Sequence, residues 1–306
     1  MLETIVNFIN TDIRMMMPIL IAAMGLVYSE RAGILNIGAE GIMLIGSFAG
    51  YVGAVYSGSP WVGILAALIS GGLVGVLFAF LTITLQADQT VVGAAMNIFG
   101  LGLSTTLNRV LFGVNSNMPK ANAFTTIQIP VLSDLPVVGE LLFQYNVLVY
   151  LAILFLVVLH IIMFRTKLGL KVRAVGENPR ACDTLGINVY RVRYGAVIFS
   201  TAMCGIAGAY MSIAQLSMFS ENMVSGRGYI ALSAVVFGKY SPLGTLIAGL
   251  VFGAGQALQV KLAALQTNFP DELLQAIPYL LTIFALVGVV GKSVSPAAET
   301  VPYDKD

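Results

Sequence analysis

Long apolar segments recur along this chain, and they constrain its fold more than any other feature. As a helix, a segment needs about 20 residues to cross roughly 30 Å of hydrocarbon. Hydrophobic residues make up 58% of the sequence and charged residues only 10%, a balance far from that of ordinary globular domains. The sequence therefore predicts an all-α polytopic membrane protein in which residues 1–306 form one transmembrane domain.

About nine membrane spans are predicted, within a range of about eight to ten. They are Ile13–Tyr28, Ile37–Tyr56, Trp61–Leu85, Val91–Leu111, Val147–Phe164, Tyr194–Leu216, the short Val224–Gly238, Leu243–Val260 and Leu273–Val290. The short, glycine-flanked segment leaves two alternatives open, a discontinuous span or a re-entrant half-helix. A re-entrant half-helix would move the C-terminus to the other side of the membrane.

Basic residues predict the orientation of the chain. Seven of them lie between two long apolar segments, in the loop 165–193: Arg165, Lys167, Lys171, Arg173, Arg180, Arg191 and Arg193. Connections rich in Lys and Arg stay in the cytoplasm, so this loop is predicted to be cytoplasmic. Counting spans from it places the N-terminus and the segment 112–145 outside, and the C-terminus inside.

A short helix is predicted within this loop. Asn178 is a favoured N-cap residue, Pro179 suits the first helical position, and Gly186 suits the end of a helix. A helix capped at both ends is a preformed, rigid element on the cytosolic surface. We therefore interpret it as a part of the membrane protein on which a soluble motor can act.

Polar side chains at membrane depth form a second candidate site. Polar groups there cost free energy and tend to face the helix bundle or a wet cavity. Gln89, Gly93 and Asn97 recur on one helical stripe, and Asn36 and Glu40 share a helical face. An interhelical hydrogen bond is the simpler role for any one such residue, but their number favours a polar translocation path. The candidate path residues are Asn36, Glu40, Gln89, Asn97, Ser233 and Gln256.

Other functions find little support in the sequence. The net charge of +1 gives no basis for nucleic-acid binding. The single histidine, His160, and the two cysteines, Cys182 and Cys204, do not have metal-ligand spacing and cannot form a disulfide framework. No set of catalytic side chains can be assembled around His160, so the chain is not expected to be an enzyme.

Three sequence blocks carry a resemblance to a known family. They are SERAGILNIGAEGIML at Ser29–Leu44, GENPRACDTLGINV at Gly176–Val189 and GRGYIALSAVVFGKYSPLG at Gly226–Gly244. Together they resemble permease subunits of ABC importers in the branched-chain amino acid/ribose permease superfamily. More closely, nearly the whole chain is similar to the smaller of the two permeases of bacterial nucleoside, or simple sugar, importers.

The resemblance implies that the second block docks on a cytoplasmic ABC ATPase subunit, in agreement with the helix predicted there. The expected docking residues are Glu177, Asn178, Pro179, Arg180, Asp183, Leu185 and Gly186. The resemblance also implies a larger second permease subunit, an extracytoplasmic substrate-binding lipoprotein, and a location in the lipid of the bacterial cytoplasmic membrane. ATP and Mg²⁺ would bind to the partner ATPase, and this chain is expected to bind no cofactor itself.

The expected cargo is a purine or pyrimidine nucleoside, moved by alternating access. Such a cargo needs hydrogen-bonding groups and a stacking surface rather than a counter-charge, and Phe199, Tyr229 and Phe237 are candidates for stacking. A simple sugar such as ribose or galactose is the alternative. An ion-coupled secondary transporter is a further alternative, for which the sequence offers few buried charged groups.

Overall fold

The described part of the chain folds into helices joined by short connections. The computed structural model describes residues 2–113, 119–126, 143–264, 273, 276–278, 280, 283 and 293–305. Its helices are α1 (Leu2–Arg31), α2 (Ala39–Ser57), α3 (Pro60–Ala79), η1 (Phe80–Thr84), α4 (Gln89–Phe112), α6 (Val147–Arg165), α7 (Lys167–Glu177), α8 (Pro179–Thr184), α9 (Val189–Ala209), η2 (Tyr210–Gln215), α10 (Arg227–Phe237) and α11 (Pro242–Ala264). The π-helical turns η1 and η2 continue α3 and α9. Within these residues the only β-type pairing is one isolated antiparallel bridge, so the all-α prediction is confirmed for this part.

Seven of the described helices are long and apolar enough to cross a membrane: α1, α2, α3 with η1, α4, α6, α9 with η2, and α11. Each overlaps one of the predicted spans. Helix α1 begins well before the predicted Ile13, because the polar residues that end the apolar segment still form helical turns. Thr11 lies in one of these turns, and its hydroxyl donates to the Asn7 carbonyl at 2.7 Å. The predicted span at Leu273–Val290 falls mostly outside the described residues.

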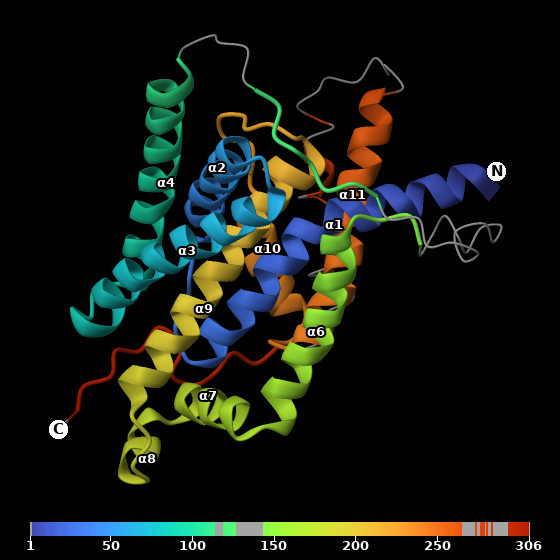
Figure 1. Cartoon of the computed structure of the whole chain (residues 1–306). Helices are drawn as coiled ribbons and strands as arrows, with labels where there is room; N and C mark the ends of the chain where they lie inside the picture. Colours follow the sequence, from blue (N-terminus) through green and yellow to red (C-terminus); the bar gives the residue numbers. More distant parts are fainter. Residues whose placement is uncertain are drawn as a thin grey trace.

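Helices α1, α2 and α9 form the interior of the bundle, and α3, α4 and α6 lie around it with many exposed apolar side chains (Figure 1). Glycines let the inner helices approach backbone to backbone. A Cβ atom at Gly46 of α2 would lie 2.4 Å from the Gly205 Cα atom of α9. One at Gly205 would lie 2.3 Å from the Ala67 carbonyl oxygen of α3. Small residues provide such close packing where lipid replaces water.

Helix α10 is too short to cross a membrane alone, since its 11 residues extend about 16 Å. In the irregular segment before it, Glu221 pairs with Arg109 near the end of α4. After it, the Tyr240 carbonyl accepts a 2.8 Å bond from Nε of Arg31, the last residue of α1. Because α4 begins beside Leu35, just after α1, Arg109 and Arg31 lie at opposite ends of the bundle. The chain therefore passes from one end to the other between Glu221 and Tyr240, partly as a half-helix.

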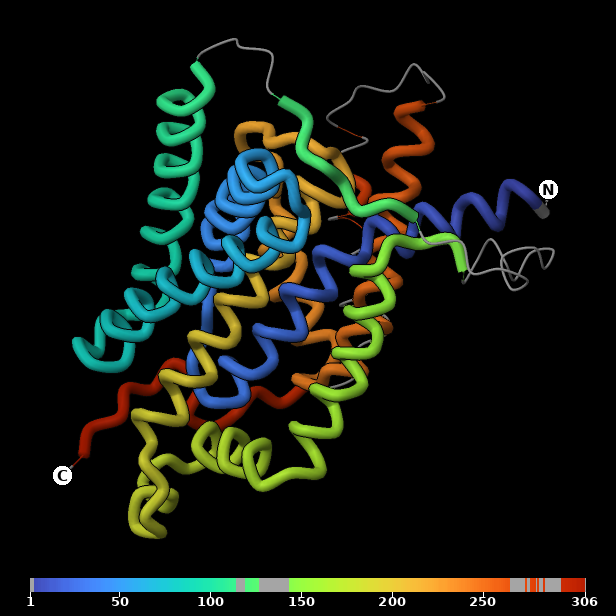
Figure 2. The backbone as a smooth tube through the Cα atoms, viewed as in Figure 1, coloured from blue at the N-terminus to red at the C-terminus, as the bar shows by residue number. Residues whose placement is uncertain are grey.

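The C-terminal segment 293–305 returns to the end of the bundle that carries α7 and α8 (Figure 2). Its Ala298 N–H donates to the Gly176 carbonyl of α7 at 2.8 Å. We call this end, with the stretch 165–193, the basic end. The contact places the C-terminal segment on the same side as that stretch, as the count of spans predicted.

Candidate functional site

The predicted short helix is present as α8, at the basic end and beyond the membrane-spanning helices (Figure 1). Pro179 occupies its first position, where a missing N–H costs nothing. The Asn178 side chain accepts a hydrogen bond from the Ala181 N–H at 3.0 Å. The predicted N-cap is therefore confirmed.

The other end of α8 is closed by a Schellman motif. Gly186 takes a left-handed conformation with φ 79°. Its N–H donates to the Asp183 carbonyl at 2.9 Å, and the Ile187 N–H donates to the Cys182 carbonyl at 3.0 Å. These two bonds satisfy carbonyls that the last helical turn leaves free. Six residues thus hold a defined helical shape because both ends are capped.

Helix α8 has a buried inner face and an exposed outer face. Cys182 is buried in an apolar cluster with Val175 and Tyr303, and burial raises the pKa of its thiol. On the outer face, Leu185 is 80% exposed and Arg180 is exposed too. A leucine and an arginine on an anchored helix offer apolar contact and hydrogen bonds, and protein interfaces combine both.

Two of the predicted docking residues also contact the C-terminal segment. Lys305 Nζ lies 3.6 Å from Oδ1 of Asp183. The Ala297 N–H donates to Oε2 of Glu177 at 3.4 Å. Glu177 and Asp183 are therefore partly engaged within the chain.

The prediction that 165–193 is a loop with seven basic residues outside the spans needs a correction at Arg193. This stretch is mostly helical, and α9 begins at Val189, where the Asn188 side chain caps it. Arg193 consequently lies one turn inside α9 and is only 2% exposed. Its Nη1 atom donates to the Val301 carbonyl at 3.2 Å. This arginine holds the C-terminal segment rather than presenting charge to solvent.

Five of the six predicted path residues, all but Asn36, gather near the beginnings of α2 and α10. We call this cluster the polar junction; its members are Glu40, Gln89, Asn97, Arg227, Tyr229, Ser233 and Gln256. Glu40, in the first turn of α2, is 8% exposed. Its two carboxylate oxygens accept from the N–H groups of Gly226 and Gly228, each at 2.7 Å. A carboxylate at a helix N-terminus satisfies free N–H groups and the helix dipole together, so Glu40 joins α2 to α10.

The predicted stripe on α4 binds the irregular backbone between α1 and α2. Gln89 Oε1 accepts from the Leu35 N–H at 2.8 Å. Asn97 Oδ1 accepts from the Gly41 N–H at 2.9 Å, and Asn97 Nδ2 donates to the Ile37 carbonyl at 3.0 Å. Both amides satisfy backbone groups of the non-helical segment and of the first turn of α2, which have no helical partners. Gln89 therefore has a structural role, as in the simpler alternative in which such residues only form hydrogen bonds within the bundle.

The other predicted path residues have different environments. Gln256 of α11 is buried and accepts from Arg227 Nε at 3.2 Å. The Ser233 hydroxyl is partly exposed and donates to the Tyr229 carbonyl at 3.1 Å. Asn36 is fully buried, and neither polar atom of its side chain has a hydrogen-bond partner among the described residues. Asn36 is therefore not part of the polar junction, and no hydrogen bond gives its amide a role.

One side of the polar junction opens at the surface between α4 and α10. Tyr229 is 46% exposed, and its hydroxyl accepts from Asn97 Nδ2 at 2.7 Å. The partly exposed Ser233 lies one turn further along α10. The predicted stackers Phe199 and Phe237 are instead packed in aromatic pairs, with Tyr28 and Phe252 respectively. Of the three aromatic candidates, only Tyr229 has its ring beside the junction.

Sequence reasoning missed the contact between Glu40 and α10 and the part played by Arg227. A signal was present, because Gly226 and Gly228 flank Arg227. A Cβ atom at Gly228 would lie 2.5 Å from the Glu40 nitrogen, so the two backbones touch there. Within the described part of the chain, His, Cys, Asp and Glu side chains form no group of three or more that could hold a metal ion.

Comparison with known proteins agrees with this architecture. The family described as branched-chain amino acid transport system / permease component matches residues 9–286. The guanosine ABC transporter permease protein NupQ of Bacillus subtilis is 38% identical over 299 residues, which cover 94% of this chain and 93% of NupQ. No solved structure matches the chain.

Two further relatives differ in the cargo that their names give. The nucleoside ABC transporter permease protein NupC of Lactococcus lactis is 36% identical, over 94% of this chain and 93% of NupC. TsgC13 of Haloferax volcanii, named for glucose transport as an ABC permease, is 32% identical over 98% of both chains. The matches extend through the helices that form the polar junction and through α8.

Proposed function

We propose, from the premise that this chain belongs to the branched-chain amino acid transport system / permease component family, that it is the smaller permease subunit of an ATP-driven nucleoside importer. The observation that carries the proposal is α8, a doubly capped helix held outside the membrane-spanning bundle at its basic end. Two relatives above 35% identity are named for guanosine or nucleoside transport, and the relative named for glucose is less similar. Together these observations favour a nucleoside as cargo.

In this proposal the basic end faces the cytoplasm of a bacterial cell. The surface of α8, from Glu177 to Gly186, docks on an ABC ATPase subunit, with Leu185 filling an apolar groove and Arg180 making polar contacts. ATP and Mg²⁺ bind to that partner and not to this chain. When the ATPase subunits close on nucleotide, they move α8 as a rigid body, and the motion reaches α9 and the C-terminal segment through the contacts described above.

The proposed translocation path follows the open side of the polar junction, where a second and larger permease subunit completes it. Tyr229 offers a ring for base stacking, and Asn97 and Ser233 offer hydrogen-bonding groups. Neutral groups of this kind suit a nucleoside, which has a flat base and several hydroxyls. Glu40 is not a counter-charge for cargo here, since both of its oxygens bind backbone N–H groups. An extracytoplasmic lipoprotein delivers the nucleoside to the end opposite α8.

A sugar is the second candidate cargo, and the similarity to TsgC13 over nearly the whole chain supports it. Sugars share the hydroxyls of a nucleoside but have no base. Asn97 and Ser233 would serve either cargo, whereas the ring of Tyr229 would contribute most to a nucleoside. The two cargoes therefore differ mainly in what they require of Tyr229.

Uptake by the complete transporter in proteoliposomes tests the proposal. Labelled guanosine and uridine are expected to accumulate with ATP and Mg²⁺ at rates at least about tenfold above those of ribose and glucose, a preference worth about 1.4 kcal/mol. Replacing Tyr229 with Ala should reduce nucleoside uptake more than replacing it with Phe. Collapse of the proton gradient should leave uptake unchanged while ATP lasts.

The same assay contains the results that would reject the proposal. Faster uptake of a sugar than of either nucleoside would favour the second candidate cargo. Accumulation without ATP, driven by an imposed ion gradient, would identify a secondary transporter instead. A transporter with a catalytically inactive ATPase subunit serves as the control for ATP dependence.

A further inference from the structure

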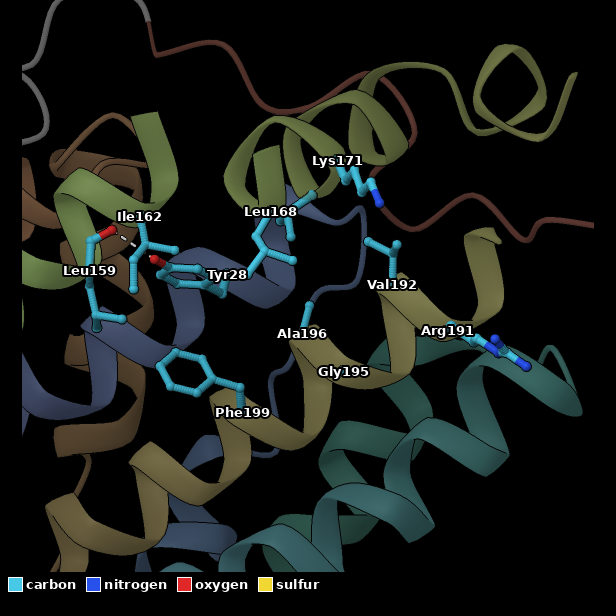
Figure 3. A pocket seen from close by; sticks show the side chains of 11 residues that line it. Tyr28, Leu159, Ile162, Leu168, Lys171, Arg191, Val192, Gly195, Ala196 and Phe199 are labelled. Atoms are coloured by element: carbon cyan, nitrogen blue, oxygen red, sulfur yellow. Dashed lines mark hydrogen bonds between the residues drawn. The ribbon is translucent and has the colours of Figure 1, made fainter. Parts of the chain in front are cut away.

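A large apolar cavity lies at the basic end, between α1, α6, α7 and α9 (Figure 3). Its volume is about 450 Å³. The rings of Tyr28 and Phe199 form one wall and lie 5.0 Å apart between their centroids. The hydroxyl of Tyr28 already donates to the Leu159 carbonyl at 2.7 Å. The wall therefore offers carbon surface to a ligand and few free polar groups.

A second cavity continues the first along the bundle. Its volume is about 750 Å³, and side chains of α1, α3, α6 and α9 line it. The two cavities share Gly195 and Phe199. Side chains of α6 on the flank of the second cavity, Leu154 and Val158, are 62% and 39% exposed, so the space opens sideways toward the membrane. We call the two cavities together the α6–α9 furrow.

Gly195 leaves the furrow open down to the backbone of α9. No heavy atom lies within 4 Å of the position that a Cβ atom would take there. Most other helical glycines of the interior, such as Gly205, touch a neighbouring backbone. Gly195 therefore does not bring two helices together, and its missing side chain leaves room for a long, thin, apolar ligand.

Positive charge marks one end of the furrow only. Lys171 of α7 and Arg191 of the first turn of α9 line the cavity at the basic end (Figure 3). Among the described residues neither side chain forms an ion pair with a carboxylate. Helix α7 lies across the ends of the spanning helices (Figure 1) and exposes Leu168 and Leu170 by 68% and 59%. Basic and apolar side chains on one such helix are typical of a helix in the headgroup region of a bilayer.

We propose that the α6–α9 furrow binds an anionic phospholipid of the leaflet at the basic end. An acyl chain lies between α6 and α9 over Gly195, and the phosphate lies at Lys171 and Arg191. Basic pockets between spanning helices on the cytoplasmic side suit anionic headgroups, and the long stems of both side chains can reach the headgroup from apolar surroundings. The furrow joins α7, which leads directly into α8, to α6 and α9, so a bound lipid braces the base of the proposed docking helix.

Lipid retention by the complete, purified transporter tests this site. The complex is delipidated, incubated with dioleoyl phosphatidylglycerol or dioleoyl phosphatidylcholine, and analysed by native mass spectrometry. The wild type is expected to retain phosphatidylglycerol preferentially. Replacing Lys171 and Arg191 with Gln should reduce this preference by about fivefold for each basic residue lost. Gly195→Leu should reduce retention of both lipids, because its side chain fills the furrow.

Matched controls lie elsewhere on the chain. Gly102 of α4 also has no heavy atom within 4 Å of a Cβ position, so Gly102→Leu should leave lipid retention unchanged. Lys120 is exposed outside the basic stretch, and Lys120→Gln should leave the preference for phosphatidylglycerol unchanged. If Gly195→Leu fails to assemble, photoactivatable phosphatidylglycerol on the wild type should label peptides of α6 and α9.

Any of three results with lipid would overturn the proposal. The first is equal retention of the two lipids by the wild type. The second is wild-type retention of phosphatidylglycerol by the Lys171 and Arg191 variant, and the third is a photoactivatable lipid that does not label α6 and α9. A further measurement asks whether protein fills the furrow instead. A cross-linker on Gly195→Cys that captured the second permease subunit would assign the furrow to a subunit interface and reject a lipid. None of these results depends on the identity of the transported cargo.

Discussion

Gly186→Val is expected to reduce ATP-driven uptake by about tenfold or more in a transporter that still assembles. Gly186 has φ 79°, and a residue with a side chain costs roughly 1–2 kcal/mol in this conformation, with β-branched residues disfavoured most. Because about 1.4 kcal/mol changes a population tenfold, the six-residue helix α8 would lose its defined end in most molecules. Uptake and ATP hydrolysis by the reconstituted transporter measure the effect.

The loss expected for Gly186→Val comes from the backbone conformation and not from steric crowding by the new side chain. A Cβ atom at Gly186 would meet no heavy atom within 4 Å, so only the backbone conformation is disturbed. Gly102→Val is the matched control, since its Cβ position is equally open and its backbone is helical. Asn178→Ala removes only the N-cap, worth roughly 0.5–2 kcal/mol, and should reduce uptake less. Normal uptake by Gly186→Val would show that the shape of α8 is not needed for coupling.

Glu40→Ala is expected to destabilise the transporter by several kcal/mol. The carboxylate accepts two hydrogen bonds of 2.7 Å from backbone N–H groups at the start of α10. Leaving a buried donor unsatisfied costs roughly 1–3 kcal/mol, so two such donors would cost several. The midpoint of thermal unfolding of the purified transporter, followed by tryptophan fluorescence and size-exclusion chromatography, should fall accordingly.

Two further substitutions of carboxylates test whether the loss of stability comes from the two hydrogen bonds of Glu40. Glu40→Gln keeps one acceptor oxygen but places an amide donor against the second N–H group, so its loss of stability should be intermediate. Glu221 is 41% exposed and pairs with Arg109 at 2.9 Å, and this bond holds the pKa of Glu221 below its ordinary value. Glu221→Gln should change the unfolding midpoint little, because solvent-exposed ion pairs contribute little to stability. Equal stability of all three variants would contradict the role of Glu40.

The caps of α8 could be predicted from the sequence because they follow local rules. Asn178, Pro179 and Gly186 each occupy the position that their backbone and side-chain chemistry favours, and no distant partner is required. The long apolar spans were predictable for a similar reason, since lipid allows few alternatives to helices. For α1 the apolar pattern predicted a span shorter than the helix. Apolar length reports the part of a helix that crosses the membrane, whereas α1 also includes polar turns before it.

The contacts of the polar junction could not be predicted, because they join positions far apart in the chain. Glu40 was found as a buried acid at the start of a span, but its partners Gly226 and Gly228 follow more than 180 residues later. Arg193 was assigned to the cytoplasmic loop, since the sequence does not show that α9 starts early enough to bury it. The α6–α9 furrow depends on the packing of five helices, α1, α3, α6, α7 and α9, around Gly195 of α9, whose Cβ position meets no heavy atom within 4 Å.

Photo-cross-linking from the outer face of α8 tests the central claim most directly. Leu185→Cys, carrying a benzophenone-maleimide, is placed in the complete transporter, where the native cysteines Cys182 and Cys204 are buried. The account predicts cross-linking to the ABC ATPase subunit, with a yield that changes between nucleotide-free and ATP-bound states. The same probe at Lys120→Cys should capture no ATPase. A probe at position 185 that never captures the ATPase, while one in the connection 239–243 or 29–36 does, would contradict the account.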